Sequence, residues 1–191
     1  MLSMTFKPFK YLLIKHDDKK WFDLIIPLGL AGVLSFAYYC LDKPFALVAS
    51  GGLVPQVNSL LQMLIGFYIA SLAAIATFGN ESIDEIMAGT PPTLKMKQRG
   101  EWQEIPLTRR RFLCYLFGYL ALMSIILYLV VVLATLLGYS GADFFKTLSG
   151  MGRMVTLKAV LLFIYLFFLI NLVFTTLLGL YYLSVRIHES S

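Results

Sequence analysis

The order of apolar and polar stretches along the chain predicts four membrane-spanning helices. The four apolar runs cover residues 21–41, 58–78, 112–137 and 155–183. Each run matches the ~20 residues that a helix needs to cross the hydrocarbon of a bilayer. The remaining segments are more polar: the ends, 1–20 and 184–191, and the connections, 42–57, 79–111 and 138–154. The pattern therefore predicts an all-α integral membrane protein, a bundle of four transmembrane helices.

The longest polar stretch, residues 79–111, joins the second and third spans. Residues 81–87 read as a short helical turn, which Gly89 and the two following prolines stop. The stretch LKMKQRGEWQEI alternates as a strand or hairpin arm does, and Gly100 leaves its shape open. Thr108 is placed to cap the third spanning helix. We expect this stretch to be the place where the protein meets a soluble partner.

Composition and charge agree with a membrane protein. Hydrophobic residues make up 59% of the chain and the mean hydropathy is +0.77, above the roughly half apolar content of soluble domains. Twelve of the sixteen Lys and Arg residues lie in 1–20, 79–111 and 184–191, which predicts that these segments are cytoplasmic. We expect a protein that crosses its membrane several times, with both termini on the cytoplasmic side. The net charge of +5 then reflects topology and attraction to anionic lipid, and no direct contact with nucleic acid is expected.

Two of the connecting segments allow more than one interpretation. Residues 1–20 mix apolar and lysine side chains, as in a stretch that lies on the membrane surface or in a flexible tail. Residues 42–57 are unusually apolar for an outward loop. They fit a turn packed between helices, or a detector of the state of the outer leaflet.

The second span carries small residues at four-residue spacing, which let another helix approach closely. We expect this span at the centre of a bundle or homo-oligomer. The predicted oligomer interface consists of Gly66, Ala70 and Ala74, with Asn58 and Gln62 at its outer end.

Two polar residues inside the spans have packing interpretations. Asn171 in the fourth span is expected to hydrogen-bond across helices and fix their packing. Asp23, near the start of the first span, is expected to reach water or neighbouring lysines; a buried carboxylate relay is the alternative.

The sequence offers little enzyme chemistry. GYSG at residues 138–141 is similar to the serine motif of rhomboid proteases. A serine nucleophile needs a nearby base, and both histidines, His16 and His188, are predicted on the opposite side from Ser140. We interpret the match as chance. No metal-ligand spacing, phosphate loop or pair of intramembrane carboxylates is present, so no catalytic residue, metal or cofactor is predicted. A secondary transporter is disfavoured because the spans carry almost no charge.

The chain as a whole resembles the KwaA family, the membrane subunits of the two-component Kiwa anti-phage defence system of bacteria. The resemblance rests on the size, the four spans with a cytoplasmic segment between the second and third, and the LTRRRFLCYLFGYL entry to the third span. It implies an inner-membrane homo-oligomer, a tetramer, that senses disturbance of the envelope during phage attack. It also implies a cytosolic effector partner of the KwaB type that binds DNA.

These observations favour a non-enzymatic sensor and scaffold that recruits a cytosolic effector. The residues predicted to contact that partner are Glu81, Asp84, Glu85, Lys95, Lys97, Arg99, Trp102, Arg109, Arg110 and Arg111. The alternative is a pore-forming protein, holin-like or of the abortive-infection type, that depolarises the membrane. A third interpretation, an immunity or superinfection-exclusion protein, would place the function in the outward loops.

Overall fold

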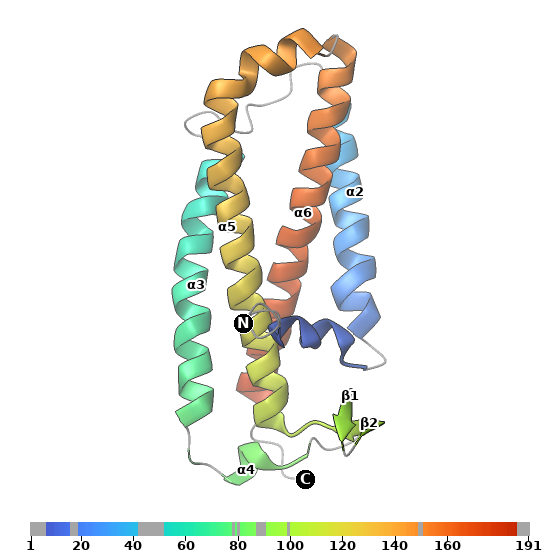
Figure 1. The fold of residues 1–191 in the computed structure, drawn as a ribbon, viewed down its shortest axis with the longest axis vertical. Helices are drawn as coiled ribbons and strands as arrows, with labels where there is room; N and C mark the ends of the chain where they lie inside the picture. The colour runs from blue at the N-terminus through green and yellow to red at the C-terminus, as the bar shows by residue number, and fades with distance from the viewer. Residues whose placement is uncertain are drawn as a thin grey trace.

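The protein is mostly helical, and four of its helices are long and apolar enough to cross a membrane. The computed structural model describes the backbone of residues 7–15, 19–41, 52–77, 79, 81–86, 91–98, 100–148 and 151–186 (Figure 1). The four candidate spans are Trp21–Tyr39, Leu53–Thr77, Arg109–Leu136 and Thr156–Ser184. The prediction of a multi-pass membrane protein is confirmed at this level.

The spanning helices lie side by side in an order that differs from the order of the sequence. A short π-helical turn, η2 (Trp21–Ile25), runs into α2 (Ile26–Tyr39), and the other spans are α3 (Leu53–Thr77), α5 (Arg109–Leu148) and α6 (Met151–Tyr181). Helix α5 lies between α3 and α6, and α6 contacts α2 on its other side (Figure 1). Within one chain α5 is thus the central helix. The span expected at the centre, α3, lies at one edge.

Packing explains why α5 is central. Half of its most apolar window is buried, against 17% for α3. Helix α3 contacts it through Leu61, Tyr68 and Ile75, which recur every seven residues and so lie on one face. On the other side α6 approaches closely at Gly179, where a Cβ atom would lie 2.8 Å from the Leu116 side chain. A larger residue here would force the Leu116 and Phe117 side chains to shift, so the glycine allows the close α5–α6 contact.

Two predicted connections are helical in part. Helix α5 continues to Leu148, runs across the end of the molecule toward α6, and α6 begins at Met151, so most of the loop expected at residues 138–154 is helix (Figure 1). A glycine in a helix costs only about 1 kcal/mol, and the glycines there do not break it. Helix α3 begins at Leu53 rather than at residue 58. Pro55 does not prevent this, because it falls in the first turn, where a backbone N–H would have no partner within the helix.

The polar segment between α3 and α5 contains the strands of the described structure. It consists of a single helical turn, α4 (Glu81–Asp84), followed by β1 (Thr93–Gln98) and β2 (Glu101–Pro106), which pair as an antiparallel hairpin. Gly100 at its tip has a φ of +95°, a conformation that favours glycine. The all-α description holds for the spans, and this hairpin is an addition to it.

The N-terminal segment is packed against the spans. Residues Lys7–Leu13 form the 3₁₀-helix η1, which lies across α5 (Figure 1). Its Tyr11 is fully buried, with ring centroids 5.0 Å from Tyr119 and 6.4 Å from Phe112. For the described residues of this segment, the interpretation as a flexible tail is therefore wrong.

Candidate functional site

The β-hairpin has one attached face and one exposed face. Leu94, on the attached face, is 1% exposed, and its neighbour Met96 packs against the main hydrophobic core. The register sets Lys97 opposite Trp102 and Lys95 opposite Glu104. Residues directly opposite each other point to the same side of a sheet, so these four side chains share the other face. Trp102 is 72% exposed, which is unusual for so large an aromatic residue.

Three contacts hold the hairpin in place. Thr93 and Lys15 exchange two backbone hydrogen bonds, of 3.0 and 3.3 Å, which add the N-terminal segment to the edge of β1. The Lys15 ammonium donates to the Glu104 carboxylate at 2.7 Å. This hydrogen bond lowers the pKa of the Glu104 carboxyl. Next to Thr93, at the open end of the hairpin, the Leu107 N–H donates to the Pro92 carbonyl at 2.9 Å and extends the strand pairing.

The arginines at the start of α5 organise the base of the hairpin. Arg110 binds Asp84 in a bidentate ion pair, with Nε–Oδ1 at 2.7 Å and Nη2–Oδ2 at 3.0 Å. Its Nη1 also donates to the carbonyls of Ile75 and Ala76, at the end of α3. Those carbonyls have no partner within their own helix. One guanidinium therefore joins α3, α4 and α5.

The cap predicted for α5 is present. The Thr108 hydroxyl accepts a hydrogen bond from the Arg111 N–H at 3.4 Å. Thr108 is thus the N-cap residue of α5, and Arg111 is the third residue of the helix. The Arg109 N–H donates to the Glu85 carbonyl at 3.0 Å.

The ten residues predicted to contact a partner are distributed unevenly. Lys95, Lys97 and Trp102 gather on the exposed face of the hairpin. Arg111 is exposed at the start of α5, and Glu85 is exposed after α4. Arg109 is 4% exposed and is therefore too buried to contact a partner. Arg110 and Asp84 form an ion pair with each other, which makes both less suited to that role. Glu81 lies in α4, its side chain outside the described part, and Arg99 lies outside the described residues.

The predicted oligomer interface faces away from the other helices of the chain. Gly66 and Ala70 are exposed and Ala74 is half-buried, and a Cβ atom at Gly66 would meet no atom within 4 Å. Gln62 donates to the Tyr128 hydroxyl of α5 at 3.0 Å, so its amide is used inside the chain. The buried Asn58 Oδ1 has no hydrogen-bond partner among the described residues. The oligomer interface stays a prediction.

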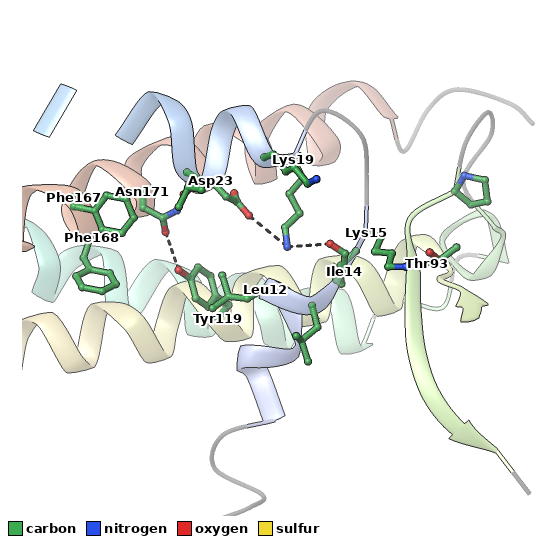
Figure 2. A pocket seen from close by; sticks show the side chains of 14 residues that line it. Leu12, Ile14, Lys15, Lys19, Asp23, Thr93, Tyr119, Phe167, Phe168 and Asn171 are labelled. Carbon is green, nitrogen blue, oxygen red and sulfur yellow. Dashed lines mark hydrogen bonds and ion pairs between the residues drawn. The ribbon is translucent and has the colours of Figure 1, made fainter. Parts of the chain in front are cut away.

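A cavity of about 900 Å³ opens beside η1, where the N-terminal segment, η2, α5, α6 and the approach to β1 meet. Figure 2 shows Phe167 and Phe168 of α6 at one end of it and Lys15 and Thr93 at the other. The cavity therefore has an apolar end among the spans and a polar end beside the hairpin.

A chain of polar contacts crosses the middle of the cavity (Figure 2). The Tyr119 hydroxyl donates to Asn171 Oδ1 at 2.8 Å, and Asn171 Nδ2 donates to the Asp23 carbonyl at 2.7 Å. The Asp23 carboxylate lies 3.5 Å from the Lys19 ammonium and accepts a hydrogen bond from the Tyr11 hydroxyl at 3.3 Å. Asn171 thus bonds to two other elements, and Asp23 pairs with a neighbouring lysine.

Lys19 is the most confined charge outside the spans. Its ammonium donates to the carbonyls of Tyr11 and Ile14 and lies 4.1 Å from the centre of the Tyr11 ring. Burial lowers the pKa of Lys19, and the Asp23 carboxylate acts in the opposite direction. Burial also raises the pKa of the Tyr11 hydroxyl, so that group is a neutral hydrogen-bond donor.

Sequence reasoning missed Tyr11 and Tyr119 as members of this network, and it expected a lysine beside Asp23 without naming Lys19. The four-residue spacing of Lys19 and Asp23 was the available signal, because side chains at that spacing are neighbours on a helix. Nothing in the sequence pointed to the two tyrosines, since tyrosine is also common at membrane interfaces.

Comparisons of the chain with models of protein families, with curated proteins and with solved structures find no match. Among the residues that the structure describes, no group of three or more His, Cys, Asp or Glu side chains is placed to hold a metal ion.

Proposed function

We propose that this chain is a non-enzymatic membrane scaffold that docks a soluble partner on its hairpin. The observation that carries the proposal is Trp102, a large aromatic side chain 72% exposed on a hairpin that is fastened on its other face. Tryptophan is enriched among residues that dominate binding energy, and a rigid presentation lowers the entropy cost of binding. Lys97 lies opposite Trp102 and gives the docking face a positive charge beside the aromatic ring.

The partner that fits this proposal is a cytosolic effector that carries the activity itself. The charge pattern predicts that the hairpin is cytoplasmic. The resemblance to Kiwa membrane subunits suggests a DNA-binding effector, a tetrameric assembly in the bacterial inner membrane, and a response to disturbance of the envelope. Helix α5 supports a signalling role, because it runs without a break from the hairpin to the opposite end of the molecule (Figure 1).

The test is co-purification of the tagged chain from its native host in mild detergent, with mass spectrometry of the complex. We expect a soluble DNA-binding protein in fixed ratio with the wild type. Trp102→Ala should weaken its binding about tenfold or more, as expected for a central aromatic contact. Gln103→Ala is the matched control, because Gln103 is exposed on the same strand but belongs to the other face of the hairpin.

Two results would count against the docking function. One is a wild-type chain that purifies without a stoichiometric partner. The other is a partner that Trp102→Ala and Lys97→Glu retain as well as Gln103→Ala does.

A further inference from the structure

The cavity beside η1 has the chemistry of a site for one membrane phospholipid. We propose that it binds an anionic phospholipid from the leaflet on the hairpin side, with the phosphate at the lysine end and an acyl chain over the phenyl rings of α6. The inference is independent of the docking function, because it concerns the chain alone and a different set of residues.

The charged side chains at the cavity favour an anion. Lys15, Lys19 and Lys20 line it, and among the described residues of the lining Asp23 supplies one carboxylate. Lys19 already donates to two backbone carbonyls and pairs with Asp23, so its positive charge offsets the negative charge of that carboxylate. Lys15 is 61% exposed, but its ammonium pairs with Glu104 at 2.7 Å. Lys20 is exposed, and its ammonium can reach a phosphate at the edge of the cavity. Basic pockets between helices at a membrane surface are typical sites for anionic headgroups.

The inner end of the cavity favours an acyl chain. The polar groups next to this end hydrogen-bond to one another. Tyr119 donates to Asn171, and Asn171 donates to the Asp23 carbonyl. Phe167 and Phe168 lie at that end (Figure 2), and Leu24 of the first candidate span also lines the cavity. Leu24 is 55% exposed and Phe168 37% exposed in the chain alone, so an acyl chain can reach both from the bilayer.

The location of the cavity selects a lipid over a soluble molecule. Leu24 and Phe168 belong to candidate membrane spans, whereas Lys15, Lys20 and Thr93 lie outside them. One molecule that contacts both groups must cross from the hydrocarbon to the headgroup layer. A phospholipid does so, and a free phosphate ion contacts the lysine end alone.

The test measures lipid that stays with the protein through purification in mild detergent, by native mass spectrometry and lipid extraction. We expect about one phospholipid per chain, enriched in anionic headgroups over the bulk membrane. Lys20→Gln should lower the anionic share about fivefold, the effect of one lysine near an anionic surface. Leu24→Trp should remove the bound lipid, because the larger ring fills the apolar end.

Each variant has a matched control. Lys7→Gln removes an exposed lysine of η1 that does not line the cavity, and Leu28→Trp adds the same ring one turn further along, outside the cavity. Both should retain the lipid. Lys20 is exposed, so Lys20→Gln should fold even if Leu24→Trp does not.

Three results would overturn the proposal. Lipid retained equally by Leu24→Trp and Leu28→Trp would place it elsewhere on the protein. A retained lipid with the headgroup composition of the bulk membrane, unchanged by Lys20→Gln, would remove the anionic specificity. Thermal stabilisation by inorganic phosphate equal to that by vesicles of an anionic phospholipid would assign the site to a soluble anion.

Discussion

Asn171 joins three elements with one side chain. Its carbonyl oxygen accepts from Tyr119 on α5, and its amide donates to the backbone of Asp23 on η2. The side chain is 4% exposed, so these two hydrogen bonds are largely shielded from the surface of the molecule. Asn171 is thus the polar contact that fixes the first span against the α5–α6 pair.

Replacement of Asn171 should loosen this junction. Hydrogen bonds between membrane helices contribute about 0.6 to 2 kcal/mol each, so we expect Asn171→Leu to lower the free energy of unfolding by roughly 1 to 4 kcal/mol. Tyr119→Phe removes one of the two bonds and should cost about half as much. The measurement is unfolding of the purified protein in mixed micelles, followed by circular dichroism.

Ser124→Ala is the control for these variants. Ser124 is fully buried in α5, and its hydroxyl has no hydrogen-bond partner within the described structure, so its removal should be near neutral. An Asn171→Leu protein as stable as Ser124→Ala would show that the two hydrogen bonds do not hold the junction.

At the scale of elements, the hairpin and the N-terminal segment form one unit. Both backbone groups of Lys15 that could pair with β1 do so, and the Lys15–Glu104 ion pair lies beside this bridge. Both side chains are substantially exposed, at 61% and 44%, so the pair is open to screening by salt. The attachment of β1 should therefore respond to pH and ionic strength.

The pH dependence follows from the lowered pKa of Glu104. A carboxyl whose pKa is lower in the folded state stabilises it fully above the unfolded pKa, about 4.3, and this contribution is lost as the pH falls through the folded value. We expect amide exchange in β1, corrected for its intrinsic rate, to rise below about pH 4. Glu104→Gln should show the faster exchange already at neutral pH, with no further rise attributable to this pair.

Glu101→Gln is the matched control, because Glu101 is an exposed carboxylate at the tip of the same strand. It should exchange as the wild type does at every pH. Equal protection of β1 in wild type and Glu104→Gln at neutral pH would show that the backbone bridge alone holds the hairpin.

The sequence predicts which helices and strands form better than it predicts which of them pack together. Hydropathy sets the spans, because the bilayer requires ~20 apolar residues whatever they pack against. Alternation indicated a strand or hairpin arm, while Gly100 left the shape of that stretch open, and Thr108 indicated the start of α5. The packing of η1 could not be predicted, because Tyr11 is buried by partners 101 and 108 residues away, Phe112 and Tyr119.

The central position of α5 escaped prediction for a related reason. Inside a membrane, lipid is as apolar as the helix surface, so hydrophobicity does not tell which helix is buried. The small residues of α3 suggested a central helix, but within the chain that ridge is exposed. The close approach occurs at Gly179 on α6 instead, a glycine that stands alone in its span.

At the scale of the whole molecule, α5 is the connecting part. Its 40 residues correspond to about 60 Å of helix, twice the ~30 Å of a hydrocarbon core, with the hairpin at its start and the segment that runs across to α6 at its end. Helices α3 and α6 pack on its two sides through buried apolar residues. Helix α5 therefore connects the hairpin to the opposite end of the molecule through one unbroken run of helix (Figure 1).

This layout separates the scaffold proposal from the pore alternative. In the described part of a single chain, most of the side chains that α5 buries against α3 and α6 are apolar, and Phe167 and Phe168 form the apolar end of the cavity. A pore would have to form between copies, and the exposed ridge of Gly66 and Ala70 on α3 is the surface that favours it.

Expression of the chain alone should therefore leave the membrane potential of the host unchanged, and the purified protein should give no conductance in planar bilayers. The measurement is a potential-sensitive dye in cells, with a known pore-forming peptide as positive control. Gly66→Leu distinguishes the outcomes: in a scaffold it changes neither signal. Depolarisation by the wild type that Gly66→Leu abolishes would assign the protein to the pore formers and place the pore at α3, since a leucine there blocks the close approach of two helices.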